Sequence, residues 1–505
     1  MTILSKSKII AFRQCPKRLW LEFHRPDLRE DSASSQAGFA AGYEVGEVAR
    51  RIYDPKGEGA ILDVKAEGVD GAIARTTNLL ATTRTPIFEA GFEAGGGRAF
   101  ADVLLPVEND GVPAWRMVEV KSSASVKGYH HDDIAVQSHI ARQSGIPLTS
   151  VALAHVDNEW VYQGGGDYNG LLTENDFTEE VLSRSAEVEQ WIAEARAVVE
   201  KSEEPTVEVG AQCSTPFACG FCDYCYRDQI SPEYPLTHLP GVGDKREADF
   251  EELGYTDLRL VPDHLLNEKQ RRVKDHTVSG TAYFDAEGAK ETLTPYGFPA
   301  RFLDFETIQF PVPIWAGTRP YEAIPFQFSL HTLHESGHLE DTAFLDLSGQ
   351  DPSFAFTKAL VEGCGIEGPI FIYSSFEKRI INEMIARYPE FTEPLQAILQ
   401  RIVDLLPVAR NHYYHPSQLG KWSIKAVLPA VCPDLNYGDL DGVQDGNAAM
   451  TAFREAIHPK TDPARRSEIE SQLLAYCKLD TLAMVKLWEF FSGRSIEASL
   501  LKEKG

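Results

Sequence analysis

Hydrophobic and polar positions follow two different periods along the first part of the chain. Apolar residues recur every three to four positions over residues 9–24 and 38–53, which predicts two helices. Period-two alternation then predicts strands over residues 87–89, 99–106 and 115–121. Helices followed by several short strands indicate a mixed α/β domain.

The same periods continue downstream. A helix is expected over residues 132–143, strands over 149–156 and 160–162, and a long amphipathic helix over 176–202. A short module over residues 236–266 follows, in which a Gly-containing turn precedes one further helix.

A second α/β pattern begins at Ala300. The segment before it, residues 274–297, is rich in Gly, Thr and charge and is expected to be a connector. The expected elements are strands over residues 301–308, 326–333, 342–347 and 369–373, and helices over residues 376–387, 467–477 and 481–491. With 505 residues the chain is too long for a single core, and about three domains are expected.

The composition is that of a soluble globular protein. Hydrophobic residues make up 43% of the chain and charged residues 25%, and no apolar run approaches the ~20 residues needed to cross a bilayer. The first residues lack an apolar stretch long enough for a signal peptide, so a cytoplasmic protein without membrane contact is expected. The formal net charge of −26 argues against a surface coated with phosphate-binding residues. It does not exclude a nucleic-acid enzyme, because metal-dependent sites themselves use carboxylates.

Three charged residues interrupt the predicted strands of the first half. Asp102 lies in an apolar run, and Glu119 and Lys121 lie two positions apart on the next strand. Alternation puts Glu119 and Lys121 on one face, and a hairpin would bring Asp102 beside them. The two carboxylates can then hold Mg²⁺ or Mn²⁺, while the lysine orients or activates a water near a phosphate. The alternative is a surface strand with a Glu–Lys pair.

This region resembles the PD-(D/E)XK nucleases of the RecB type, in which an aspartate, a Glu-x-Lys strand and a helix bearing glutamine follow one another. Gln137, sixteen positions after Lys121, matches that glutamine. Such nucleases also use an acidic or histidine residue on an early helix, a place that Glu47, or else Glu44, would take. The resemblance implies a restriction-endonuclease-like fold whose nuclease centre consists of Asp102, Glu119, Lys121, Gln137 and Glu47.

Four of the eight cysteines lie in one short stretch, as Cys213, Cys219, Cys222 and Cys225. In a cytosolic chain this clustering indicates metal or cluster ligation rather than disulfides. Four thiolates suit Zn²⁺ and equally suit an iron–sulfur cluster. Cys15, far upstream, is a fifth candidate.

One cysteine before the nuclease fold and several after it is an arrangement similar to the iron–sulfur subgroup of RecB-type nucleases. The resemblance implies a [4Fe–4S] cluster that ties the two ends of the domain together. Five thiols compete for four places, and equal spacing favours Cys15, Cys213, Cys219 and Cys225, with Cys222 as the alternative ligand. A zinc knuckle made of the four clustered cysteines stays open as the other interpretation.

The small central module resembles one helix-hairpin-helix unit. In that motif a Gly-rich turn, here residues 239–243, exposes backbone N–H groups to a DNA phosphate at a helix start. Lys245 and Arg246 would favour DNA binding, whereas the acidic residues around them oppose it. DNA binding and an ordinary turn between helices are equally supported.

Two acids, Asp304 and Glu306, interrupt an apolar strand of the second pattern and lie on the same face. Burying two like charges is costly unless a cation compensates them. Farther downstream, Tyr476 and Asp480 are one helical turn apart, so both point the same way. This order resembles the DEDD exonucleases of the ribonuclease H type, whose first motif is Asp-x-Glu and whose third is Tyr-x3-Asp.

The second motif departs from that family. Its usual form is Asn-x2-Phe-Asp, whereas this chain has Tyr373-Ser374-Ser375-Phe376-Glu377, which keeps the charge with one more methylene. The resemblance implies that Mg²⁺ or Mn²⁺ ions bind Asp304, Glu306, Glu377 and Asp480 while Tyr476 positions the attacking water. Asp404 is a further acid expected to approach this site.

Aromatic and basic residues also mix over residues 411–425. That composition suits stacking and backbone contact with a single nucleic-acid strand, and core packing explains the aromatic residues nearly as well.

The order of all these parts resembles a bacterial family named only as a domain of unknown function, number 2779. The resemblance implies four segments: residues 1–230 as a RecB-type PD-(D/E)XK nuclease domain with the cysteine cluster, residues 231–275 as the helix-hairpin-helix-like module, residues 276–299 as a connector, and residues 300–505 as a ribonuclease H-like DEDD exonuclease domain. The expected fold class is thus α/β, with two nuclease-type domains joined by a small helical module.

The leading hypothesis is a metal-dependent nuclease that hydrolyses phosphodiester bonds of DNA. One version of this hypothesis is an exonuclease that acts on single strands. The expected cellular role is DNA repair, recombination or defence. Nucleic acid is the expected partner, DNA before RNA, and the sequence indicates no protein partner. The alternative is a nucleic-acid-binding or scaffold protein whose nuclease folds no longer cut, which Glu377 and the acidic net charge favour. If only one centre cuts, the intact set of Asp102, Glu119 and Lys121 is expected to be that centre.

Overall fold

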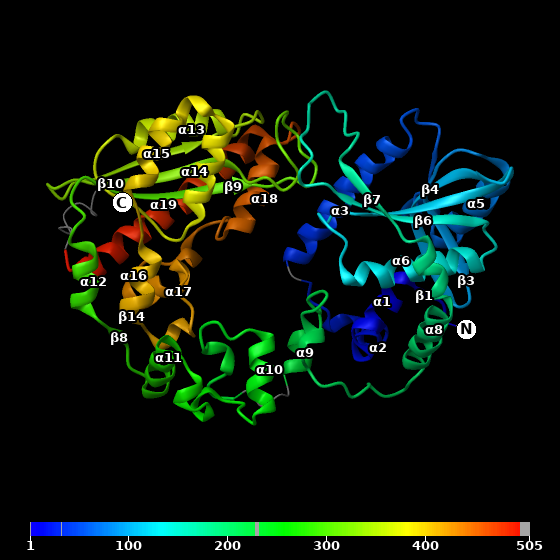
Figure 1. Cartoon of the computed structure of the whole chain (residues 1–505), viewed down its shortest axis with the longest axis horizontal. Helices are drawn as coiled ribbons and strands as arrows, with labels where there is room; N and C mark the ends of the chain where they lie inside the picture. Colours follow the sequence, from blue (N-terminus) through cyan, green and yellow to red (C-terminus); the bar gives the residue numbers. More distant parts are fainter. Residues whose placement is uncertain (1, 32, 228–231, 495–505) are drawn as a thin grey trace. The chain divides into compact units, whose positions relative to one another are not determined.

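The chain folds into two compact units (Figure 1). The computed structural model describes residues 2–31, 33–227 and 232–494. The first unit comprises Met1–Ile230 and Phe310–Glu322, and the second comprises Ser231–Gln309 and Ala323–Gly505. The segment Phe310–Glu322 therefore lies within the second half of the sequence but packs in the first unit.

A seven-stranded mixed sheet forms the centre of the first unit. Its strands run in the order β2-β3-β4-β5-β6-β7, and β1 pairs with β4. Strands β3, β4 and β5 are antiparallel neighbours, and β6 runs parallel to β5. The bounds are β1 Leu4–Ser5, β2 Ala60–Ile61, β3 Ile87–Ala94, β4 Gly97–Asn109, β5 Val112–Lys121, β6 Leu148–Val156 and β7 Leu172–Asp176.

Helices cover this sheet, and α6 is buried along most of its length because it packs into the largest hydrophobic core of the unit. The helices are α1 Lys6–Gln14, α2 Pro16–His24, α3 Ala33–Tyr53, α4 Val64–Glu67, α5 Val69–Thr82, α6 Gly128–Gln143, α7 Thr178–Ser183, α8 Ser185–Val199 and α9 Cys222–Tyr226. Pro16 divides the helix expected over residues 9–24, because its ring and missing N–H suit only the first turn of α2.

Two expectations for the first unit were wrong. The long helix expected over residues 176–202 begins with the end of β7 and is divided at Arg184 into α7 and α8. Residues 160–162 form no strand. Instead the N–H of Tyr162 donates to the carbonyl of Thr318 (3.0 Å), and Tyr162 accepts from the N–H of Gly317 (2.7 Å), so this aromatic stretch binds the distant Phe310–Glu322 segment.

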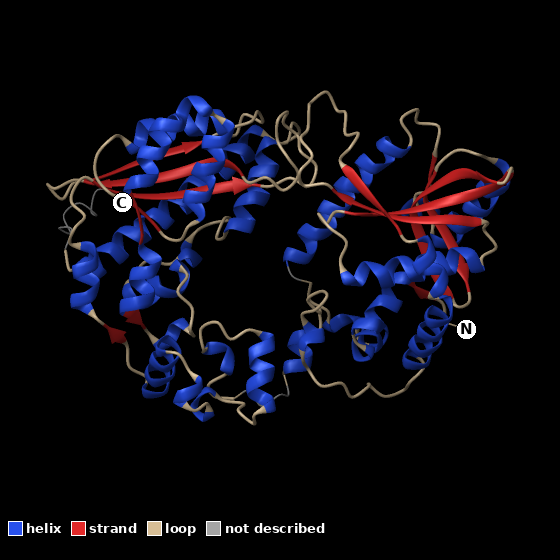
Figure 2. Ribbon diagram, in the orientation of Figure 1, coloured by secondary structure: helices blue, strands red, loops and turns tan. Residues whose placement is uncertain are grey.

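A five-stranded mixed sheet forms the centre of the second unit, in the order β11-β10-β9-β12-β13. Strands β9, β10 and β11 are antiparallel, whereas β12 runs parallel to β9 and β13 parallel to β12. Figure 2 shows the sheet with helices on both sides. The bounds are β9 Ala300–Ile308, β10 Ile324–Leu333, β11 Leu339–Leu345, β12 Ile370–Ile372 and β13 Ile402–Asp404.

The two faces of β9 belong to different cores. Leu303 and Phe305 pack with helices α13, α14 and α15, whereas Phe302 packs with α12, α16, α17 and α19. Alternation along the strand therefore puts Asp304 and Glu306 on the face of Phe302, the face that α19 covers. The main helices of this unit are α10 Asp244–Glu252, α11 Glu268–Ser279, α12 Ala286–Leu293, α13 Ser353–Cys364, α14 Phe376–Arg387, α15 Thr392–Arg401, α16 Leu405–His412, α17 Ile424–Val431, α18 Gly446–Ile457 and α19 Pro463–Ser492.

The expected connector over residues 274–297 was wrong, because it contains the end of α11, the short strand β8 (Tyr283–Phe284) and α12. A capping box of Asn267 and Gln270 begins α11, and Gly280 in the left-handed conformation ends it, so the caps define a helix whose surface is largely polar. The helices expected over residues 467–477 and 481–491 form one helix, α19. Strand β8 pairs with β14 (Tyr413–Tyr414).

The module before these helices has a small core of its own, made of Leu236, Leu239, Val242, Phe250, Leu258, Val261 and Leu266. Helix α10 follows Gly241, whose φ of +75° turns the chain into the helix. Over the described residues, every helix is too short or too polar to span a membrane.

A substitution at Gly368, just before β12, would test how tightly the second sheet is packed. Its φ is +76°, and a Cβ added there would lie 2.0 Å from the carbonyl oxygen of Pro299. Gly368→Ala should therefore lower the free energy of unfolding by about 2–4 kcal/mol in denaturant titration. Gly337→Ala is the matched control, because φ is +87° but the space around it is open, and it should cost only about 1–2 kcal/mol. Equal losses would contradict the packing argument.

Candidate functional site

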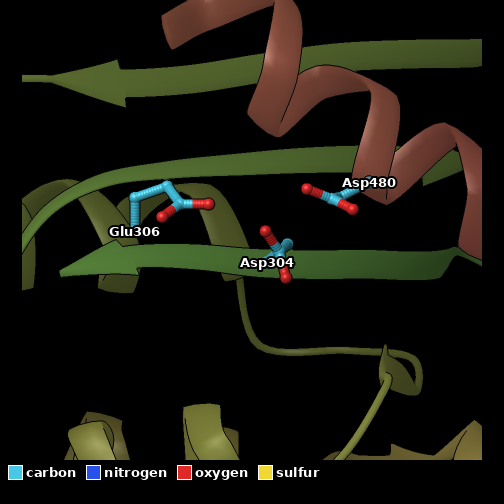
Figure 3. A group of neighbouring side chains, drawn as sticks. All are labelled: Asp304, Glu306 and Asp480. Atoms are coloured by element: carbon cyan, nitrogen blue, oxygen red, sulfur yellow. The ribbon is translucent and has the colours of Figure 1, made fainter. Parts of the chain in front are cut away.

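A group of three carboxylates gathers on the α19 face of the second sheet. Asp304 and Glu306 come from β9 and Asp480 from α19, and one carboxylate oxygen of each lies within 4.8 Å of the others (Figure 3). Among the described residues, no other group of three or more Asp, Glu, His or Cys side chains brings its ligand atoms within this distance of one another. Oxygen ligands at such spacing suit a hard divalent cation such as Mg²⁺ or Mn²⁺.

A fourth acid, Glu377, lies in the first turn of α14. The residue is 3% exposed, and its buried Oε2 accepts no hydrogen bond from the described residues. Burial raises the pKa of Glu377 to about 8, and the Asp404 and Asp480 carboxylates add to this rise. A buried carboxylate oxygen without a partner is costly, and a bound ion is one way to compensate it.

The cluster is electrostatically frustrated without a cation. Burial raises the pKa of Glu306 to about 8 and that of Asp480 to about 6, and burial with the neighbouring Asp480 holds the pKa of Asp304 well above its usual range. Each carboxyl is disfavoured as an anion because it is removed from water beside like charges. A divalent cation would reverse this effect and release the protons.

Tyr476 and Lys425 border the cluster. Tyr476 lies one turn before Asp480 on α19. The Lys425 Nζ lies 3.4 Å from the Tyr476 Oη, donates to the carbonyl of Gln444 (2.8 Å), and lies over the ring of Tyr437. The Tyr437 Oη donates to Asp480 Oδ1 at 2.6 Å. The cluster therefore has a lysine and two phenols at its edge.

Sequence reasoning found Tyr476 but missed Tyr437, a single tyrosine in a short 3₁₀ turn that belongs to no motif. Of the two interpretations of residues 411–425, core packing holds for Tyr413, Tyr414 and Trp422, which are buried and so do not form a stacking surface. Lys425, from the same block, has a charge that favours the ionised forms of Glu306 and Asp480. Asp404 accepts from the N–H groups of Leu406 (2.9 Å) and Ser374 (3.0 Å) and so caps α16.

The acids of the first unit also lie together, on β4 and β5. Asp102 accepts from the backbone N–H of Val120 at 2.7 Å. Glu119 is 2% exposed, and its Oε1 accepts from Lys121 Nζ at 2.7 Å, whereas its buried Oε2 has no hydrogen-bond partner among the described residues. Burial and the Glu119 carboxylate hold the pKa of Asp102 well above its usual range.

Two charged residues that the sequence did not indicate complete this centre. Lys6, at the start of α1, donates to Glu119 Oε1 (2.7 Å) and to Gln137 Oε1 (2.6 Å). Asp133, one turn before Gln137 on α6, accepts from both Lys6 and Lys121. Burial opposes the ionisation of Asp133, but the two ammonium groups outweigh it and lower the pKa of this carboxyl. Gln137 therefore lies on α6 and is linked to Glu119 through Lys6.

The early-helix acid, Glu47, pairs with Arg50 at 2.7 Å. Arg50 lies 3.5 Å from Glu89, and Glu89 lines a cavity with Asp102, Val120 and the helix α3 glycines Gly42 and Gly46. Glu89 lies opposite Asp102 on β4, between the pairs Phe88↔Val103 and Ala90↔Ala101, and its φ is 57°. A positive φ is uncommon for a residue other than glycine, and here the acid beside Asp102 is Glu89 rather than Glu47.

The five cysteines are half-buried and unbridged. Burial raises the pKa of Cys219 and of Cys225, and in both cases the thiols of Cys15 and Cys213 contribute. Burial also raises the pKa of Cys222 to about 11. The side chain of Gln14 donates to the carbonyls of Gln212 and Phe217, each at 2.7 Å, so the end of α1 is tied to the cysteine stretch.

Residues 301–423 match the family model of a domain of unknown function, DUF2779. The matched segment begins at β9 and contains Asp304, Glu306 and Glu377, and it ends before Lys425 and α19. No curated protein matched the chain.

The raised carboxyl pKa values predict how stability depends on pH in metal-free protein. Between about pH 4.5 and about 8, folded Glu306 keeps a proton that the unfolded chain has lost, so its contribution to stability falls as pH rises. Thermal melting in chelator should show this fall in the wild type and less of it in Glu306→Gln. Glu335→Gln, an exposed control, should follow the wild type. Parallel profiles for Glu306→Gln and the wild type would contradict the prediction.

Proposed function

We propose that the protein is a metal-dependent nuclease that hydrolyses phosphodiester bonds of DNA. The observation that carries the proposal is the convergence of Asp304, Glu306 and Asp480, with the buried acid Glu377 coupled to them. Divalent cations held by such carboxylates polarise a phosphoryl oxygen and lower the pKa of a bound water. The rest of the chemistry falls to the residues around them.

In the second unit, three antiparallel strands followed by two parallel ones support a ribonuclease H-like DEDD fold. Asp304, Glu306 and Asp480 are the proposed ligands. Glu377, whose charge raises the pKa of Asp304, would approach them from α14 through its extra methylene. Tyr476 orients the attacking water from one helical turn away. Lys425, an exposed lysine at the edge of the cluster, would contact the phosphate of the substrate.

In the first unit, a helix, the strands β3, β4 and β5, helix α6 and the parallel strand β6 follow in the order of a restriction-endonuclease-like domain. Asp102 and Glu119 are the proposed metal ligands, and the Glu119 Oε2, which has no hydrogen-bond partner in the described part of the chain, fits that role. Lys121 holds the attacking water, and Gln137 lies beside Glu119, where it accepts from Lys6. The helix-hairpin-helix-like module, with the Gly241 turn before α10, would contact DNA backbone.

We further propose a [4Fe–4S] cluster on Cys15, Cys213, Cys219 and Cys225, with Cys222 as the alternative ligand. Thiolates around one zinc ion lie about 3.8 Å apart, since each Zn–S bond is ~2.3 Å and the geometry is tetrahedral. Among the described residues no three cysteine sulfurs lie within 4.8 Å of one another, so these thiols lack the close spacing of a tetrahedral zinc site. The cluster would hold α1 against the cysteine stretch.

The nuclease proposal predicts that two centres contribute to cleavage. Cleavage is assayed with Mg²⁺ or Mn²⁺ on labelled single- and double-stranded DNA and RNA. Asp102→Asn should lower the cleavage rate of the first centre, and Asp304→Asn that of the second, each by about 100-fold or more. The double variant should be inactive. Asp110→Asn and Glu335→Gln, exposed acids of the two units, are the controls. No cleavage by the wild type would overturn the proposal in favour of a binding or scaffold protein, and a fully active double variant would show that the activity lies elsewhere.

The proposed [4Fe–4S] cluster predicts that the protein absorbs visible light. Protein purified without oxygen should be brown, with a broad charge-transfer band that dithionite bleaches, and Cys219→Ser should lose both the band and the iron. Cys432→Ser, a half-buried cysteine of the second unit, should keep them. A colourless protein that contains zinc would replace the iron–sulfur cluster with a zinc site.

A further inference from the structure

The centre of the first unit contains an ammonium group that the proposed chemistry does not use. Lys6 directly follows β1, and β1 pairs with β4 through Leu4↔Gly97, so the strand pairing delivers the lysine to the sheet that carries Asp102. Its Nζ has acceptors at 2.7 Å on Glu119, 2.6 Å on Gln137 and 3.2 Å on Asp133. These are three acceptors for the three N–H groups of a lysine.

Lys6 differs in this respect from Lys8 on the same helix. Lys8 pairs with Glu22 at 2.8 Å, on α2, and its contact holds two helices together. The acceptors of Lys6 are instead the proposed metal ligand Glu119 and the two polar residues of α6 that face it. A tether for α1 would not need these particular partners.

The geometry places both lysines on one oxygen. Glu119 Oε1 accepts from Lys6 and from Lys121, each at 2.7 Å. A divalent cation on Glu119 and Asp102 would then lie close to two ammonium groups, which repel it. Metal binding would be favoured if one ammonium group moved away to another anion.

We infer that Lys6 is a positioning residue that couples metal binding to nucleic-acid binding at this centre. The inference rests on the proposed function of the first unit. In the free protein the Lys6 ammonium group donates to Glu119 Oε1 and takes the place of a metal cation there. A phosphate of a bound strand attracts the Lys6 ammonium and frees the oxygen, so that metal and strand each raise the affinity of the other. The centre therefore assembles fully only on its substrate.

The test measures Mn²⁺ binding rather than cleavage. Full-length protein carrying Asp304→Asn and Asp480→Asn, which weaken metal binding in the second unit, is titrated with Mn²⁺ and followed by electron paramagnetic resonance. Lys6→Met should bind Mn²⁺ about tenfold more tightly, because the variant lacks one positive charge that repels the ion. A unit charge about 6 Å from a divalent ion has an effect of this size even at the dielectric constant of water. Lys8→Met should bind as the parent protein does.

The strand supplies the second arm. A phosphorothioate oligothymidine, which resists hydrolysis, should raise the Mn²⁺ affinity of the parent protein by a similar factor and that of Lys6→Met much less. Unchanged or weaker Mn²⁺ binding in Lys6→Met, or no effect of the oligonucleotide on the parent, would overturn the inference and leave Lys6 as a tether. If Lys6→Met fails to fold, Lys6→Gln removes the charge but keeps hydrogen bonding, and the same tightening is expected. Mn²⁺ binding that survives Asp102→Asn would instead overturn the proposed metal centre itself.

Discussion

The repulsion among buried carboxylates is the constraint on which the second unit depends. Asp304, Glu306, Glu377 and Asp480 come from β9, α14 and α19, which are otherwise joined by apolar cores on both faces of the sheet. Apolar packing in both cores therefore holds like charges together, and this costs free energy that a bound cation would offset. The neighbouring phenols and Lys425 moderate this cost without removing it.

The first unit meets the same constraint in a different way. There Glu119 and Asp133 are balanced by Lys6 and Lys121 within the chain, so the acids are compensated before any ion binds. The acids of the second unit therefore carry an electrostatic penalty that an external cation would relieve, whereas the acids of the first unit already have ammonium partners within the chain. Two sites with similar acids can differ in metal affinity for this reason alone.

Period-two alternation was enough to predict that Asp304 and Glu306 share a face, and helical spacing that Asp480 lies near Tyr476, because both follow from local geometry. The same holds for Glu119 and Lys121 on β5. Lys6 could not be predicted, since its place depends on the pairing of a two-residue strand with β4 about 90 residues away. Glu89 and Tyr437 were missed for a similar reason: an acid at a strand position with positive φ and a loop tyrosine have no periodic signal.

The segment Phe310–Glu322 has a consequence for how the chain is made. It leaves the second sheet between β9 and β10 and supplies Val312 to a buried cluster that contains Val45 and Val156 of the first unit. The first unit is thus incomplete until residue 322 has been synthesised, by which time β9 of the other unit already exists. Neither unit corresponds to a contiguous stretch of sequence. A chain that ends at residue 230 therefore lacks the segment Phe310–Glu322 and exposes apolar residues that this segment covers in the first unit.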